Sequence, residues 1–380
     1  MGLLKEKYKK VQIITHDDLD GYGAGAVMVS FLTDQMEYNL DDIIVTNTDY
    51  SNPFPVQDEC NFVIVTDISI STQDLLEKIK EFESKPENIL LWFDHHQSTV
   101  DLLNAFKGPK NYVANIMGSG TLLAWLFTHF AISIMESYHT ICGKVPAMSE
   151  EFFRNYLLPI VNNSNINISN FLKLYNDSIS SYNDSYIPLG IQMIDDYDRW
   201  IHANKNSIYL NSAFYNNPNF VRDCKSPEFI SLLYNEESEL TEAIKLGKFL
   251  YNSEKLTFLI NLKNNGFIVS PKGYENINIL CIESTFGNST HFGNTLKDYP
   301  YKSKMSFTKN GEYKVSIFAT DNAETSAMTI CLSYGGGGHP KAAGFTVKEY
   351  PWINVRSLTK EIIDLINSEI EWILNNINNN

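Results

Sequence analysis

The sequence predicts an α/β protein with two domains: an N-terminal domain with a parallel β-sheet flanked by helices, and a smaller C-terminal α/β domain across a cleft. Three observations support this prediction. The chain has 380 residues, which exceeds the usual range of a single domain. Short β-branched and aromatic runs alternate with helical patterns in the first part, which is typical of a parallel sheet covered on both faces. A second alternating set follows in the last third of the chain.

The expected elements of the first domain lie within residues 1–205. Apolar runs predict buried strands at residues 11–15, 42–46, 61–66 and 88–93. Helical spacing predicts helices at 21–33 and 72–83, and a longer helical region from residue 120 to about 161. An Asn- and Ser-rich stretch near 162–185 is interpreted as a surface insertion.

The second half is expected to contain a helical linker, residues 206–255, followed by a domain over 256–380. Helical spacing at 227–251 is the basis for the linker. In the second domain, the pattern predicts strands at 256–261, 277–283, 313–319 and 344–347. It also predicts a helix at 324–333 and a closing amphipathic helix at 353–377.

Charge and cysteine content limit the classes of partner and compartment. The net charge of −15 argues against binding of long duplex nucleic acid, but a small anionic substrate held by metal ions is compatible with it. The five cysteines show no CxxC spacing, which indicates a reducing compartment without a disulfide framework or a zinc site. We found no secretory signal pattern and no apolar stretch long enough to span a bilayer. These features predict a cytoplasmic protein without a membrane partner.

The segment THDDLDG places His16, Asp18 and Asp20 directly after the first predicted strand. A polar turn is the simplest interpretation. A calcium loop of EF-hand type is excluded, because it would need a carboxylate in place of His16 and a glutamate in place of Val27. In an extended segment, residues 16, 18 and 20 point to one side, at the strand end where open α/β sheets bind ligands.

Two further predicted strands end in the same kind of residue. Asp67 follows one of them, and Asp94, His95 and His96 follow the other. Any one of these ends could be a satisfied cap, but carboxylates at three successive strand ends would repel one another unless cations bound between them. Mixed histidine and carboxylate ligands suit Mn²⁺, with Mg²⁺ or Co²⁺ as alternatives. Two such ions that share a carboxylate form an arrangement that cleaves phosphate esters.

Four segments, THDDLDG, VTDIS, FDHHQS and GGGGHPKAAGF, together resemble the DHH phosphoesterase family with its DHH-associated C-terminal domain. The family is named for Asp-His-His, here Asp94-His95-His96. Within this family, the motif HDDLDGYGAG most resembles the motif of exonucleases that degrade very short RNAs, or nano-RNAs.

The resemblance implies a role for each residue of these motifs. The implied metal ligands are His16 and Asp18 for the first ion, Asp20 and His95 for the second, and Asp67 as a bridge. His96 would contact the substrate phosphate, and Asp94 would orient the histidines. One more aspartate is expected from MIDDYDRWIH, with Asp196 preferred and Asp198 as the alternative.

The glycine-rich segment of the second domain has two interpretations. Consecutive glycines let the backbone approach an anion, although they also suit a flexible hairpin turn. The segment is not a P-loop, because no Gly-Lys-Ser/Thr follows. The resemblance makes it a clamp for the substrate's phosphate or terminal nucleotide, formed by Gly335, Gly336, Gly337, Gly338 and His339. Asn288, in FGNSTHFGN, is expected to add a contact.

The function expected from these features is that of a hydrolase with two divalent ions, Mn²⁺ foremost. It would be a phosphodiesterase that cleaves short oligonucleotides to mononucleotides. A cyclic-dinucleotide phosphodiesterase or a 3′-phosphoadenosine 5′-phosphate phosphatase is the alternative enzyme. The alternative that is not an enzyme is a non-catalytic binding member of the family that has lost its metals. The sequence does not decide whether the substrate is RNA or DNA, which base is preferred or in which direction cleavage proceeds. It also leaves the oligomeric state open, with a homodimer as one option.

Overall fold

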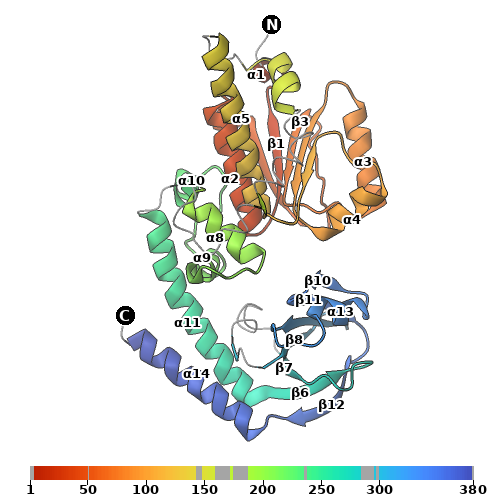
Figure 1. Ribbon diagram of the computed structural model, residues 1–380, viewed down its shortest axis with the longest axis vertical. Coiled ribbons are helices and arrows are strands. Elements are labelled where there is room, and N and C mark those ends of the chain that lie inside the picture. Colours follow the sequence, from red (N-terminus) through yellow and green to blue (C-terminus); the bar gives the residue numbers. More distant parts are fainter. Residues whose placement is uncertain are drawn as a thin grey trace. The chain divides into compact units, whose positions relative to one another are not determined.

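A computed structural model describes residues 4–49, 51–142, 148–158, 172–173, 187–234, 238–283, 295–296 and 299–378. The chain divides into two compact units, Met1–Lys248 and Phe249–Asn380, which are treated separately below (Figure 1). Within the described ranges, no helix is both long enough and apolar enough to cross a membrane.

The first unit is built on a five-stranded, fully parallel sheet, which confirms the predicted architecture. Its strand order is β2-β1-β3-β4-β5. The strands are β1 (Val11–His16), β2 (Ile43–Thr48), β3 (Phe62–Thr66), β4 (Ile89–Asp94) and β5 (Tyr112–Ala114). The three central strands are β1, β3 and β4, and their near-complete burial matches their continuous apolar runs. Strand β5 was not expected from the sequence.

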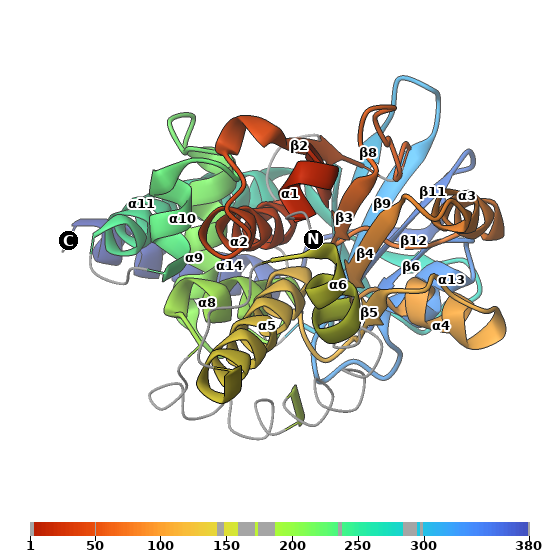
Figure 2. The ribbon, with the colours of Figure 1, turned by 90° about the horizontal axis from the view of Figure 1, so that it is seen from above.

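Helices cover both faces of this sheet, and each face has its own core (Figure 2). On one face, α2 (Leu19–Asp34) and α5 (Gly120–Cys142) pack on strand residues such as Ile13. On the other face, α3 (Gln73–Ser84) and α4 (Gln97–Ala105) pack on residues such as Ile14. Successive strand residues therefore enter opposite cores, as the two-residue period of a β-strand requires.

Further helices complete the first unit. The longer ones are α8 (Leu189–Asp198), α9 (Lys205–Asn216) and α10 (Pro227–Tyr234), and the short elements are α1 (Leu4–Lys7), η1 (Leu40–Asp42), α6 (Glu150–Phe152) and a π-helical turn, η2 (Phe153–Leu157). The expected surface insertion near 162–185 lies outside the described residues, apart from 172–173.

The second unit contains a seven-stranded mixed sheet with the order β10-β11-β9-β8-β7-β6-β12. Only the pair β7–β8 is parallel. Its elements are β6 (Gly266–Pro271), β7 (Ile279–Glu283), β8 (Tyr301–Phe307), β9 (Tyr313–Ala319), α13 (Ala327–Leu332), β10 (Gly337–His339), β11 (Ala342–Val347), β12 (Trp352–Ser357) and α14 (Lys360–Asn378). Helix α11 (Glu239–Asn265) begins in the first unit and ends in the second.

Two local predictions for the second unit were wrong. The run at 256–261, expected as a strand, belongs to α11, where Tyr251, Lys255, Phe258 and Leu262 are buried at helical spacing. The closing helix was expected from residue 353, but residues 352–357 form β12 and pair with β6. In both cases a short window of β-branched and aromatic residues fits either structure, and the pairing partners decide between them. Strands β6, β8, β10 and β12 had not been predicted.

Candidate metal centre

The carboxyl ends of β1, β3 and β4 lie side by side because the three strands are parallel neighbours. Strand β1 ends at His16, β3 ends one residue before Asp67, and β4 ends at Asp94. The motifs that follow these strands are therefore brought to one edge of the sheet, as expected for ligand sites in open α/β sheets.

His16, Asp18 and Asp67 form the first group of possible metal ligands. The Nδ1 atom of His16 lies 2.7 Å from Oδ2 of Asp18 and 3.8 Å from Oδ2 of Asp67. Asp18 is also the N-cap of α2, and its Oδ1 accepts a 2.8 Å hydrogen bond from the Gly21 N–H. Burial opposes ionisation of Asp18, but hydrogen bonds from His16 and Gly21 keep its pKa below the usual value.

Asp20, His95 and Asp198 form a second group. The Nε2 atom of His95 lies 3.7 Å from Oδ2 of Asp20 and 3.2 Å from Oδ2 of Asp198. The same nitrogen is 3.2 Å from Oδ1 of Asp67. Asp67 therefore lies between the two groups, with one carboxylate oxygen toward His16 and the other toward His95.

Asp67 occupies an unusual backbone position. Its φ angle is +56°, in the left-handed region that non-glycine residues rarely adopt. Its N–H donates a 2.8 Å hydrogen bond to the Phe93 carbonyl of the neighbouring strand. This turn aims the carboxylate into the cluster, and its strain is of the kind that accumulates at functional sites.

Two buried carboxylate oxygens of the cluster accept no hydrogen bond from the described residues: Oδ1 of Asp67 and Oδ2 of Asp198. Burial, followed by repulsion from Asp20 and Asp18, raises the pKa of both groups well above the usual value. A buried anionic oxygen without a donor is costly unless a cation neutralises it. The oxygen and imidazole donors present here fit divalent cations such as Mn²⁺.

His96 forms a third group of possible ligands with Asp67 and His95, and Asp94 lies next to His96. Nδ1 of His96 is 2.7 Å from Oδ1 of Asp94, whose side chain is fully buried. Burial opposes ionisation of Asp94, but the hydrogen bond with His96 keeps the pKa of Asp94 below the usual value. The His96 side chain is 28% exposed and that of His95 4%, so His96 is the more accessible of the two rings.

Asp196, preferred over Asp198 from the sequence, is placed elsewhere. Its carboxylate accepts hydrogen bonds from the N–H groups of Ala203 and Asn204, at 2.8 and 3.2 Å, and from Oγ of Ser207 at 2.6 Å. It therefore holds the segment that leads into α9. Residues i and i+2 of a helix point in directions about 200° apart. Asp196 and Asp198 therefore face different sides of α8, and Asp198 is the one that enters the cluster.

The N-terminus of α5 is a functional element that the sequence analysis missed. The N–H groups of Gly120 and Thr121 donate to the two oxygens of Asp20, at 2.6 and 2.9 Å, and the Thr121 hydroxyl donates to the Asp20 carbonyl at 2.7 Å. The sequence signal was MGSGT, a Ser/Gly/Thr cluster where a fourth strand end meets a helix. Helix N-termini carry a partial positive charge that favours such a carboxylate.

The glycine-rich segment of the second unit forms part of a sheet edge. Gly337–His339 is the exposed strand β10, antiparallel to β11. Gly335 and Gly338 have positive φ angles of 76° and 137°. A side chain on Gly336 would meet the Gly344 carbonyl oxygen at 2.1 Å. Close packing on β11 thus requires some of these glycines, and their predicted contact with an anion stays a prediction. Asn288 lies outside the described residues.

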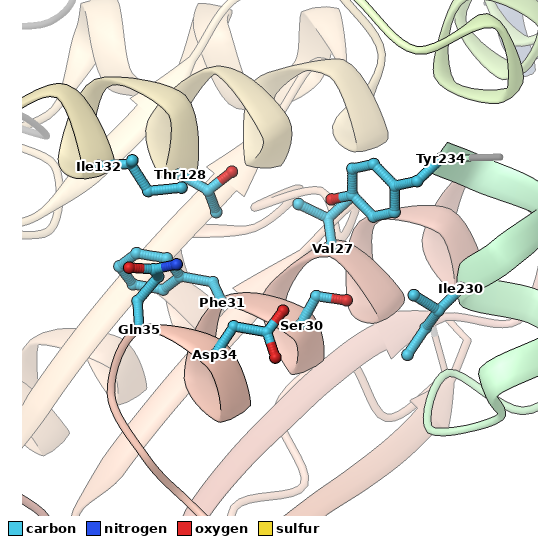
Figure 3. Close-up of a pocket in the computed structure, with 9 residues that line it drawn as sticks. All are labelled: Val27, Ser30, Phe31, Asp34, Gln35, Thr128, Ile132, Ile230 and Tyr234. Atoms are coloured by element: carbon cyan, nitrogen blue, oxygen red, sulfur yellow. The ribbon is translucent and has the colours of Figure 1, made fainter.

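A separate cavity of about 350 Å³ lies among α2, α5 and α10 (Figure 3). Val27, Phe31, Ile132 and Ile230 give it mainly apolar walls, and Asp34 from α2 lies on its lining. It shares no residue with the metal cluster.

Comparison with known proteins agrees with this site. Residues 10–145 match the model of the DHH family, N-terminal domain, and they include all the clustered ligands except Asp198. Among the curated proteins, none matches the chain.

Several solved structures are similar to the chain at low identity. The DHH domain of a member of the s1p family of ribosomal proteins is 13% identical, with a TM-score of 0.50 and coverage of 96% of this chain and 87% of that one. Exonuclease RecJ bound to manganese is 14% identical (TM-score 0.46; 97% and 91% covered). The pGpG-specific phosphodiesterase PggH from Vibrio cholerae is 13% identical (TM-score 0.41; 96% and 99% covered). At these identities the likeness concerns the fold alone. Residues 10–145, which contain the strand-end motifs, are therefore similar to the N-terminal domain of the DHH family.

Proposed function

We propose that this protein is a metal-dependent phosphodiesterase that hydrolyses short oligonucleotides and releases mononucleotides. The observation that carries the proposal is the cluster at the sheet edge, in which buried carboxylate oxygens of Asp67 and Asp198 lie beside His95 without accepting a hydrogen bond from the described residues. Such an arrangement favours cations over an empty acidic pocket.

Of the three groups of possible ligands, we assign two to two divalent ions and leave His96, from the third, for the substrate. His16, Asp18 and Asp67 would hold the first, and Asp20, His95 and Asp198 the second, with Asp67 shared. Asp198 thus takes the role that the sequence analysis had given to Asp196. The four carboxylates balance two divalent charges, so an anionic phosphodiester can approach despite the acidity of the whole chain.

Ions bound at these places would lower the pKa of a water molecule and stabilise charge on the phosphoryl oxygens. The protein's own groups would do the rest. Asp94 orients the His96 ring through the 2.7 Å contact at Nδ1, and we assign Nε2 of His96 to a phosphoryl oxygen of the substrate. The α5 N-terminus holds both oxygens of Asp20 through backbone N–H groups, so this ligand is oriented before any ion binds.

Short substrates are favoured by charge. The net charge of −15 argues against an extended basic surface along which a long strand could gain affinity. In the second unit, the exposed segment Gly335–His339 is the predicted contact for the substrate's phosphate or terminal nucleotide. His339→Ala should therefore reduce turnover of short oligonucleotides while the metal content stays at two equivalents.

The test is a substrate panel with purified protein and Mn²⁺. We expect hydrolysis of RNA or DNA of two to five nucleotides, greater than that of a long strand, and loss of activity after EDTA treatment. A cyclic dinucleotide and 3′-phosphoadenosine 5′-phosphate, included as separate arms, would identify the alternative enzyme if either were the better substrate. Full activity after exhaustive chelation would contradict the metal-dependent mechanism, and a protein that binds no Mn²⁺ would be a binding member of the family.

A further inference from the structure

An ion pair with a buried carboxylate lies next in sequence to Asp198, a member of the second group of ligands. Asp195 is fully buried in α8, and its two oxygens face Arg199, with Nε to Oδ1 at 2.8 Å and Nη2 to Oδ2 at 2.5 Å. Oδ1 of Asp195 also accepts a 2.7 Å hydrogen bond from the N–H of Ser119. Asp195 belongs to none of the clusters of possible metal ligands among the described residues.

The contacts of Asp195 join two segments that are far apart in the sequence. Ser119 directly precedes Gly120 and Thr121, whose N–H groups hold the Asp20 carboxylate. Arg199 directly follows Asp198 at the end of α8. Both Asp20 and Asp198 face Nε2 of His95. The hydrogen bond from Ser119 to Asp195 therefore ties the segment that holds Asp20 to the segment that carries Asp198, and Arg199 holds the Asp195 carboxylate that accepts this bond.

We propose that Arg199 and Asp195 are positioning residues that fix Asp20 and Asp198 relative to each other and so set the affinity for the second metal ion. This inference rests on the proposed function. Residues behind the metal ligands typically change metal affinity or activity by about 10- to 100-fold when they are altered.

The geometry requires an arginine. The planar guanidinium meets both oxygens of one carboxylate at once, which fixes the orientation of Asp195 and thereby of its bond to Ser119. A lysine at 199 would keep the charge but could not reproduce this two-point contact. Without any cation, Asp195 would be one more buried negative charge next to the cluster.

The first unit offers a matched control. Arg154 pairs with Glu150 at the same i,i+4 spacing, with Nε to Oε1 at 2.8 Å. The side chains of this pair are 35% and 28% exposed, compared with 12% and 0% for Arg199 and Asp195. Arg154 also contacts the Tyr8 hydroxyl and the Pro86 carbonyl, and Glu150 also pairs with Lys7. None of these residues belongs to the metal cluster.

The experiment is a titration of metal-free protein with Mn²⁺. Binding is measured by calorimetry and by the EPR signal of the Mn²⁺ that remains free. Wild type should bind two equivalents. Arg199→Met should weaken binding of one equivalent by about 10- to 100-fold and leave the other within about twofold of wild type. Arg199→Lys should give an intermediate loss, and Arg154→Met should bind both ions as wild type does.

Three outcomes would overturn the inference. Two of them concern Arg199→Met: binding of both ions with wild-type affinity, and an equal loss of affinity for both. If Arg199→Met does not fold, Arg199→Lys decides, and wild-type affinity in that variant counts against the two-point contact. A wild type that binds no Mn²⁺ would refute the proposed function itself, and that result is distinguishable because it appears before any variant is compared.

Discussion

The backbone N–H of Gly120 donates a 2.6 Å hydrogen bond to Oδ2 of Asp20, a residue 100 positions earlier in the chain. A Cβ atom on Gly120 would lie 2.7 Å from Cβ of Asp67 and 3.0 Å from the same Asp20 oxygen. The helix terminus thus approaches two proposed ligands so closely that only a glycine fits.

Gly120→Ala should therefore disturb the metal centre more than the fold. The added methyl group must push Asp67 or Asp20 from its place, and both residues are buried. We expect Mn²⁺ affinity to fall at least tenfold, as measured by titration of metal-free protein. Gly337→Ala is the control, because a side chain there meets nothing within 4 Å, and its metal content should equal that of wild type. Unchanged Mn²⁺ affinity in Gly120→Ala would show that the close approach is unimportant.

Asp67→Asn should abolish turnover and leave the protein folded. The substitution removes the negative charge proposed to lie between two cations, while asparagine tolerates the positive φ of 56° better than most residues. Without metal, the variant should unfold at a higher temperature than wild type near neutral pH. The reason is that one of several mutually repelling buried charges is gone. Burial, followed by this repulsion, raises the pKa of Asp67. Activity and thermal unfolding check the two halves of this prediction. Near-normal turnover with Mn²⁺ would mean that Asp67 is not a ligand.

Asp198→Asn and Asp196→Ala should have opposite consequences. Asp198→Asn should lower the bound Mn²⁺ from two equivalents toward one without loss of stability, because its Oδ2 accepts no hydrogen bond from the described part of the chain. Asp196→Ala should keep both ions and destabilise the protein, because three donors lose their acceptor. An unsatisfied buried donor costs roughly 1–3 kcal/mol. Metal analysis and denaturant unfolding of both variants separate the roles, and loss of metal from Asp196→Ala alone would restore the original assignment.

The effect of Mn²⁺ on stability should depend on pH. Asp67 and Asp198 have pKa values raised by burial and then by neighbouring carboxylates, so each holds its proton more tightly in the folded than in the unfolded chain. The metal-free protein should therefore gain stability as pH falls through these raised pKa values. The gain should end near the ordinary aspartate pKa of about 4, where Asp18 and Asp94, whose pKa values are lowered, begin to act in the opposite direction.

Bound Mn²⁺ competes with those protons, so its stabilising effect should shrink as pH falls. Thermal unfolding between pH 8 and 5, with EDTA or with Mn²⁺, measures the gap in unfolding temperature between the metal-free and the Mn²⁺-bound protein. A gap that is constant over this range would argue that neither carboxylate binds the ion.

The sequence determined the architecture of the first unit and the identity of most clustered residues. Buried parallel strands are continuous apolar runs, and their carboxyl ends must meet at one sheet edge, so His16, Asp67 and His95 could be placed together from their positions after such runs. Local pattern alone was insufficient where a run suits two structures. This ambiguity explains why residues 256–261 were expected as a strand and form part of a helix.

Only the tertiary structure decided the contacts between distant segments. The choice between Asp196 and Asp198 depends on which side of α8 faces His95, and the packing of that helix is not encoded in its own sequence. The hold of α5 on Asp20 and the link from Arg199 through Asp195 to Ser119 likewise join segments about 80 to 100 residues apart. Backbone N–H groups carry no side-chain signature, so a carboxylate that binds them becomes visible only when the chain is folded.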